Sequence, residues 1–258
     1  MIRRFALLPI ALLTVCVALL VACGGPPTAP ALSDPKEIVT KGVTSLAGVK
    51  SFEFTGTFTG NVTGGQLGTF DLSSVALAGA VDIPNQAAKL SLDAPSILGT
   101  KIDAIVTGGN LYFKTAGAAA IGLGGSADKY TKVAVPSGSA NPISAATDMT
   151  KVVADLQTML AALPVQPTKA ADERCSDQDC YHVTLKLSGD QLRGLSPTTP
   201  AIDGDVTLDL LTRKSDYRPG RIAISTTSPS LGSIGMTIDL KYDVSVSVQA
   251  PAADQIAP

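Results

Sequence analysis

The sequence predicts an α+β fold in which an antiparallel β-sheet is covered on one face by amphipathic helices. Apolar and polar residues alternate in about eight segments, which is the period of a half-buried strand. Two other segments repeat their apolar residues at helical spacing. The apolar 45% of the chain is mainly valine, isoleucine, leucine and alanine, with no tryptophan, a composition that suits sheets.

The chain begins with a lipoprotein-type export signal. Arg3 and Arg4 precede an uncharged apolar run from Phe5 to Val21, and small residues then lead to Cys23. In such signals the cysteine takes a diacylglyceryl group and the peptide before it is removed. We therefore expect residues 1–22 to be a signal peptide and Cys23 to anchor the chain outside the cytoplasm. A single membrane-spanning anchor is the alternative, because about 17 apolar residues are the lower limit for crossing a bilayer.

We expect the mature chain to consist of a flexible tether followed by one domain. Residues 23–33 are rich in glycine, proline, alanine and serine, which is typical of a flexible linker. No linker interrupts residues 34–256, so we expect a single domain there. Loss of the two signal arginines leaves a net charge of −4, which argues against a nucleic-acid partner.

The domain is predicted to open with a helix. Asp34 is suited to the N-cap, Pro35 to the first helical position and Glu37 to a capping box. We expect about 13 helical residues with one apolar side. That side contains Ile38, Val39, Val43, Leu46 and Val49.

From Ser51 the period changes from 3.6 to 2, which predicts a meander of antiparallel strands. Turn residues separate the strands at 61–65, Pro84-Asn85, Pro95-Ser96 and 108–110, the last of which is typical of a hairpin loop. The residues on the apolar faces are Phe52, Phe54, Phe58, Val75, Leu77, Val81, Ile83, Leu90, Leu92, Ile102, Val106, Leu111 and Phe113. Residues 115–128 are mostly alanine and glycine, and we expect a mobile loop there, with a short buried strand as the alternative.

A second amphipathic helix is predicted over residues 143–163, ended by Pro164. Alternation then resumes, with apolar faces that contain Tyr181, Val183, Leu185, Leu187, Val206, Leu208, Leu210, Ile222 and Ile224. The clearest alternation runs from Ile234 to Val248. A strand of that length spans about 50 Å, so it must bend or cross a wide curved sheet.

Cys175 and Cys180 are predicted to form a local disulfide, since the mature chain lies in an oxidising compartment. A metal site is the weaker alternative, because His182 is the one histidine in the chain. We expect its imidazole to be solvated on the polar face of its strand. The acidic residues near the cysteines form either a solvated loop or a weak cation site. They are Asp172, Glu173, Asp177 and Asp179.

Together these features resemble the LppX/LprG family of mycobacterial and related lipoproteins. The matching segments are the export signal, the first helix ending at Val49–Phe52, the stretch Gly109–Lys114, the second helix and residues 250–256. The resemblance implies a strongly curved antiparallel half-barrel, similar to the periplasmic carrier LolA, with helices covering its concave face. It also implies a cavity for acyl chains and a role in binding or transporting lipids and glycolipids of the cell envelope. The cysteine pair and the lack of tryptophan depart from the family pattern.

The residues themselves favour a lipid site because the strands present more apolar surface than two helices can cover. A half-barrel with a partly unfilled interior is one solution, and a fully packed core is the other. The packed alternative would be a structural or interaction protein of the cell surface. The predicted cavity lining is Phe52, Phe54, Phe58, Leu77, Val81, Leu90, Leu92, Ile102, Val106, Leu111, Phe113, Val152, Leu156, Leu160, Val183, Leu185, Leu208, Leu210, Ile222, Ile224, Met236, Ile238 and Leu240.

We expect no enzymatic activity, no cofactor and no metal. The sequence has no nucleophile elbow, no H-E-x-x-H pair and no phosphate-binding glycine motif. A hydrolase that uses carboxylates alone is the weakest alternative, since no pair of acidic residues stands out.

Overall fold

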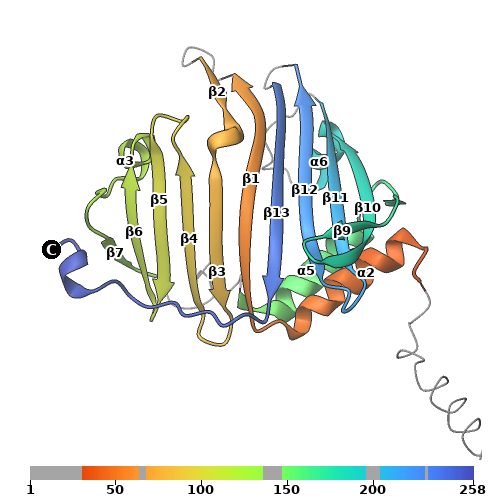
Figure 1. The fold of residues 1–258 in the computed structure, drawn as a ribbon, viewed down its shortest axis with the longest axis horizontal. Helices are drawn as coiled ribbons and strands as arrows, with labels where there is room; N and C mark the ends of the chain where they lie inside the picture. The colour runs from red at the N-terminus through yellow and green to blue at the C-terminus, as the bar shows by residue number, and fades with distance from the viewer. Residues whose placement is uncertain (1–30, 64–67, 136–146, 196–203, 230–231) are drawn as a thin grey trace, which may run out of the picture. The chain divides into compact units, whose positions relative to one another are not determined.

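In the part of the chain that the structure describes, thirteen strands form one antiparallel sheet, in the order β7-β6-β5-β4-β3-β1-β13-β12-β11-β10-β8, with β2 beside β1 and β9 beside β10 (Figure 1). The computed structural model describes residues 31–63, 68–135, 147–195, 204–229 and 232–258. The predicted signal peptide, Cys23 and most of the tether lie outside these residues. The number of strands exceeds the predicted eight because several short strands carry no readable alternation. The strands are β1 (Ser51–Thr63), β2 (Thr69–Asp71), β3 (Ala76–Asp82), β4 (Ala87–Ala94), β5 (Thr100–Thr107), β6 (Asn110–Ala116), β7 (Thr131–Ala134), β8 (Thr168–Lys169), β9 (Glu173–Cys175), β10 (Gln178–Ser188), β11 (Asp205–Arg213), β12 (Pro219–Ser228) and β13 (Gly232–Tyr242).

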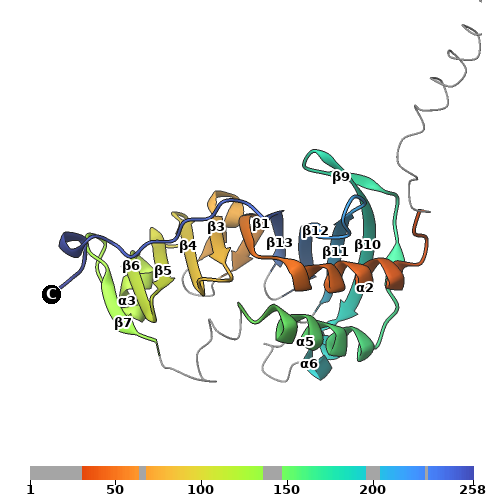
Figure 2. The same cartoon turned by 90° about the horizontal axis from the view of Figure 1, so that it is seen from below.

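The helices lie mainly on one face of one half of the sheet, which confirms the predicted α+β class. Figure 2 shows α2 (Pro35–Ser45) and α5 (Met149–Ala161) side by side below the half of the sheet that contains β10 to β13. Helix α2 contacts β10, β11 and α5. In the part of the chain that the structure describes, β5 and β6 carry only the short helix α3 (Ala118–Leu123), and α6 (Gly189–Leu195) follows β10.

Helix α2 begins where the sequence predicts. The Asp34 side chain accepts a hydrogen bond from the Lys36 amide at 2.9 Å, so it caps the helix. Glu37 does not complete a capping box, because it pairs with Lys41 Nζ at 3.0 Å. Ile38 is fully buried against the sheet. A short 3-10 turn, η1 (Leu46–Gly48), then leads into β1.

The second helix is shorter than predicted. Asp148 was expected within a helix over residues 143–163, but its carboxylate accepts a hydrogen bond from the Lys151 amide at 3.0 Å and caps α5. The helix therefore starts at Met149, since a side chain bonded to the backbone in this way ends the repeating pattern on its N-terminal side. Residues 143–146 of the predicted helix lie outside the described residues.

The loop expected over residues 115–128 is found only at residues 124–128, and the alternative of a buried strand holds only for Thr115 and Ala116. Strand β6 continues to Ala116, Gly117 turns the chain with φ 61°, and the alanine-rich stretch after it forms α3. A Cβ at Gly117 would lie 2.3 Å from the Leu98 carbonyl oxygen, so only glycine fits this turn. Alanine has the highest helix propensity, which explains why this stretch is helical. The neighbouring hairpin at Gly108-Gly109 is confirmed, with both residues at positive φ.

The last strand ends earlier than predicted, at Tyr242 instead of Val248. Asp243 has a φ of 53°, and its carboxylate is bonded to the Lys50 amide and to Arg218. The hydrogen bond from the Arg218 guanidinium lowers the pKa of Asp243. Beyond this turn, residues 243–258 form a segment that we call the C-terminal strap, which is extended except for the 3-10 turn η4 (Ala253–Gln255). Half-buried and exposed residues do alternate in the strap, as predicted. Its valines are half-buried, but they lie outside the sheet.

The C-terminal strap crosses the ends of the strands and reaches the far edge of the sheet (Figure 1). There the Tyr130 amide donates to the Gln255 carbonyl at 2.8 Å, and the Ala257 amide donates to the Tyr130 carbonyl at 2.8 Å. The strap thus connects the end of β13 with the chain just before β7. Its last residues satisfy backbone groups at an edge that would otherwise face water.

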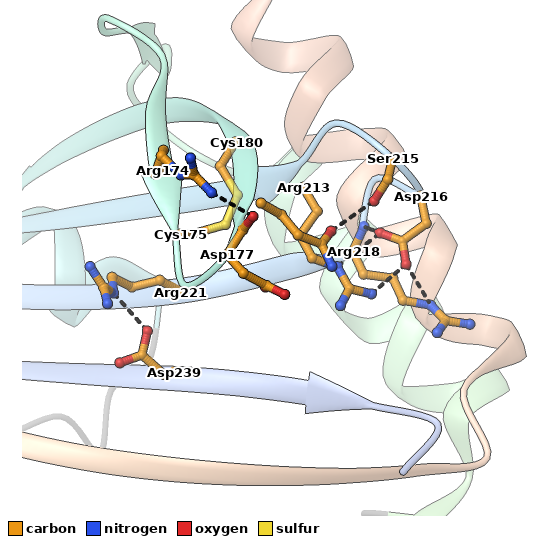
Figure 3. Close-up of a disulfide and its surroundings, with 11 residues drawn as sticks. Arg174, Cys175, Asp177, Cys180, Arg213, Ser215, Asp216, Arg218, Arg221 and Asp239 are labelled. Atoms are coloured by element: carbon orange, nitrogen blue, oxygen red, sulfur yellow. Dashed lines mark hydrogen bonds and ion pairs between the residues drawn. A yellow bond between two sulfur atoms is a disulfide. The ribbon is translucent and has the colours of Figure 1, made fainter. Parts of the chain in front are cut away.

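Cys175 and Cys180 form a disulfide, as the spacing predicts. Figure 3 shows it at the hairpin between β9 and β10, where the Arg174 guanidinium donates to the Asp177 carbonyl at 2.7 Å. Both cysteines are buried and pack with Leu211. The disulfide therefore fastens a hairpin that has only a small apolar cluster beneath it.

Replacing both cysteines with serine should lower the free energy of unfolding by about 2 kcal/mol, the loop-entropy value for a closed loop of about six residues. Denaturant unfolding of the wild type and the double variant measures this difference. A reducing agent should destabilise the wild type by the same amount and leave the double variant unchanged. Equal stability of the two proteins would contradict the prediction.

Candidate functional site

A single apolar face runs across nearly the whole sheet. The pairing register places one row of residues side by side on β10, β11, β12, β13, β1, β3, β4 and β5. The row consists of Val183, Leu210, Ile222, Ile238, Gly56, Leu77, Leu92 and Ile102. It extends for about 34 Å at about 4.8 Å per strand. All strand residues of the predicted lining lie on this face, which we call the apolar face; that they contact a ligand stays a prediction.

The apolar face is buried at one end and partly open at the other. Beneath α2, Val183 of β10 is 2% exposed and Leu185 is 8% exposed. On the strands without helical cover in the described residues, Leu90 of β4 is 39% exposed and Val133 of β7 is 46% exposed. The predicted shortage of helical cover is therefore concentrated on β3 to β7.

A cavity of about 370 Å³ lies between the helices and the covered end of the apolar face. Its walls come from the N-terminal half of α2, the C-terminal end of α5, the segment that follows α5, and β10 and β11. The lining residues are Lys36, Val39, Thr40, Gln157, Leu160, Ala161, Leu163, Val165, Gln166, Pro167, Val183, Leu185, Leu208 and Leu210. The walls are mainly aliphatic, and the polar side chains come from the helices and the connecting segment.

Five of the residues predicted to line a cavity do so: Leu160, Val183, Leu185, Leu208 and Leu210. The others on the strands share the apolar face but lie outside this cavity, and Val152 and Leu156 of α5 are also not part of its wall. The prediction missed the contribution of α2 and of residues 163–167. The apolar side of α2 was visible in the sequence, but its placement over β10 and β11 depends on contacts distant along the chain.

The aromatic ring of Phe54 covers a glycine near the centre of the apolar face. A Cβ added at Gly79 of β3 would lie 2.3 Å from Cζ of Phe54, so the Phe54 ring occupies the space above this glycine. Phe54 also contacts the ring of Phe52, with 6.3 Å between the ring centroids. These rings therefore fill the space above the glycine on this part of the apolar face.

His182 lies on the opposite, polar face, and the prediction that it is solvated is wrong. Its Nδ1 is 3.0 Å from Glu173 Oε1, its Nε2 is 2.8 Å from Asp209 Oδ1, and the side chain is 15% exposed. The reason is β9, which folds back along β10 and brings Glu173 beside the ring. Thr184 donates to the same Asp209 oxygen at 2.7 Å. This network lies on the face away from the cavity.

Two of the four acidic residues near the cysteines, Asp172 and Glu173, lie beside basic side chains. The Asp172 carboxylate lies 2.5 Å from Lys169 Nζ and 2.8 Å from Lys214 Nζ. Burial alone would raise the pKa of Asp172, but these two ammonium groups lower it overall. Among the residues that the structure describes, no three metal-ligating side chains gather at one point.

Tyr242 is the last residue of β13 and lies on the apolar face opposite Phe52. The guanidinium groups of Arg213 and Arg218 lie 5.2 and 5.6 Å from the centroid of its ring, and burial raises the pKa of its phenol. Figure 3 shows Asp216 between Arg213 and Arg218, and it pairs with both. Arg218 also pairs with Asp243. The positive charges at this end are therefore neutralised within the protein.

A second depression, of about 380 Å³, lies over β1, β3, β4 and β5. Its border includes Glu53, Lys89 and Asp103, whose strand positions place them on the polar face. A surface with charges of both signs does not suit an acyl chain. The cavity between the helices and the apolar face is therefore the candidate site.

The fold is that of known mycobacterial lipoproteins. The chain superimposes on the lipoprotein LppX of Mycobacterium tuberculosis with a TM-score of 0.50 and 13% identity, covering 83% of this chain and 98% of LppX. LprF from Mycobacterium bovis gives a TM-score of 0.51 and 13% identity, covering 85% of this chain and 97% of LprF. No family model and no curated protein sequence matches the chain. The predicted resemblance to the LppX/LprG family is thus confirmed for the fold.

Proposed function

We propose that this protein is an extracytoplasmic lipoprotein that binds a lipid or glycolipid and holds an acyl chain between α2, α5 and the apolar face. The observation that carries the proposal is the aliphatic cavity of about 370 Å³ at the covered end of that face. This volume falls within the range of about 300–1,000 Å³ that is usual for ligand pockets. A fully packed core, the predicted alternative, would leave no such space between its side chains.

The chemistry of the wall suits a hydrocarbon ligand. Each methylene group moved from water into an aliphatic site contributes about 0.8 kcal/mol, so chain length sets the affinity without specific polar contacts. The walls contributed by Leu208 and Leu210 adjoin Ile224 and Ile222 on β12 through the pairing register. A chain longer than the cavity could therefore continue along the open part of the apolar face, where it would cover residues that are now half-exposed.

The anchoring part of the proposal comes from the export signal and Cys23. In the described part of the chain, no helix has the length and hydropathy needed to cross a bilayer.

The dissociation constant of a saturated fatty acid should fall about fourfold for each added methylene group until the cavity is filled, which corresponds to about 0.8 kcal/mol per group. Displacement of a fluorescent fatty acid by acids of 8, 10, 12 and 14 carbons measures the slope. Native mass spectrometry after mild extraction from the source membrane should also detect a co-purifying lipid. A protein that carries no lipid and takes up no fluorescent fatty acid would instead support the packed alternative.

A further inference from the structure

One positively charged side chain lies in the lining of the cavity. Among the described residues that line it, Lys36 is the only one with a charged side chain. The residue is exposed, so its aliphatic stem can contact the wall while its ammonium group remains in water. Thr40, Gln157 and Gln166 add hydrogen-bonding groups to the same lining. The lining therefore combines an aliphatic wall with four polar residues, one of which, Lys36, is positively charged.

The carboxylates near Lys36 have other partners. Glu37 pairs with Lys41 at 3.0 Å, and Asp34 accepts the backbone N–H of Lys36 at 2.9 Å. Four basic side chains of β8, β11 and the loop after β11 are in ion pairs. These pairs are Lys169 and Lys214 with Asp172, Arg213 with Asp216, and Arg218 with Asp243. Among the described residues, no acidic side chain forms an ion pair with Lys36.

We infer that Lys36 binds the headgroup of the lipid and makes the site selective for acyl lipids whose headgroup bears an anionic phosphate or carboxylate. This inference rests on the proposed function, because the acyl chain must occupy the cavity. An ammonium group next to such a headgroup forms a charge-assisted hydrogen bond, which a zwitterionic or neutral headgroup makes more weakly or not at all. The occupant is therefore an amphiphile with complementary parts: hydrocarbon for the wall and negative charge for Lys36.

The position of Lys36 in the chain fits this assignment. It follows Asp34, where the compact unit begins, by two residues. Asp34 is the eleventh residue after Cys23, so the chain between them spans at most about 38 Å when fully extended. The polar end of the cavity would then be within reach of the headgroups of the anchoring membrane.

The test uses two lysophospholipids with the same acyl chain, one with an anionic phosphatidylglycerol headgroup and one with a zwitterionic phosphatidylcholine headgroup. Each competes for the full mature protein with a fluorescent fatty alcohol, a neutral probe of the cavity. We expect the wild type to bind the anionic lipid about tenfold more tightly. Lys36→Gln should remove this preference and Lys36→Glu should reverse it, where the preference is the ratio of the affinities of one variant for the two lipids. Lys41→Gln, on the same helix, is the matched control and should keep the preference.

The remaining outcomes separate the two proposals. Uptake of none of the lipids by the wild type would overturn the proposed function. Uptake without a headgroup preference, or a preference that survives in Lys36→Gln, would overturn the role of Lys36 and leave the lipid site intact. Glycerol phosphate without an acyl chain should not displace the alcohol. If it competes as well as the anionic lipid, the residue binds free anions and the inference is wrong.

Discussion

Replacement of Leu208 by tryptophan should weaken acyl-chain binding about fiftyfold. Leu208 lies on β11 in the wall of the cavity, and the larger indole would occupy space that the ligand needs. Loss of room for three methylene groups costs about 2.4 kcal/mol at about 0.8 kcal/mol each. Leu208 is half-buried beside an open volume, so the new side chain can extend into the cavity without displacing the sheet. Displacement of a fluorescent fatty acid measures the change.

The adjacent residue provides a matched control. Thr207 precedes Leu208 on the same strand and lies on the polar face, so Thr207→Trp adds the same side chain on the opposite face of the sheet. We expect it to bind fatty acid as the wild type does. The chain has no tryptophan of its own, so in each variant the indole is the sole fluorophore of its kind. Its emission should respond to fatty acid in Leu208→Trp only. Equal affinities of the two variants would show that the acyl chain binds elsewhere.

The face of each strand could be predicted because side chains alternate across a sheet with a period of exactly two residues. Once Phe54 is assigned to the apolar side, every second residue of β1 follows, and antiparallel pairing extends the assignment to the neighbouring strands. Leu77 and Ile238, which flank Gly56 in the structure, were assigned to the same face although 161 residues separate them. Local pattern was sufficient here.

The cavity required information that local pattern does not contain. Lys36 and Leu208 line the same volume because α2 packs on β10 and β11, which lie more than 140 residues later in the chain. The start of α5 was wrong for a different reason: a single side chain, Asp148, bonds to the backbone where the apolar pattern gives no boundary. The environment of His182 depended on β9, a strand of three residues that is too short to show alternation.

The end of β13 shows how a correct pattern can support a wrong element. The alternation from Ile234 to Val248 is continuous in sequence, but one residue, Asp243, takes a left-handed conformation and directs the chain out of the sheet. The valines beyond it are half-buried at a different surface, so the period of two persists. An extended strap and a strand have the same side-chain alternation, and only the hydrogen-bond partners distinguish them.

Substitution of Cys23 by alanine should abolish acylation and with it stable membrane attachment. Two acyl chains hold a protein to a bilayer durably, whereas the mature chain without them has only the domain and its tether. Labelled palmitate should enter the wild type and the control Cys16→Ala but not Cys23→Ala. Because the unacylated precursor can keep its signal peptide, a second variant carries residues 24–258 behind a signal that is cleaved independently of a cysteine. We expect this variant in the soluble extracytoplasmic fraction, whereas the wild type stays with the membrane. Labelling of Cys23→Ala would show that another residue is acylated and would contradict the prediction. A wild type that takes up no label and still stays with the membrane would favour the spanning anchor.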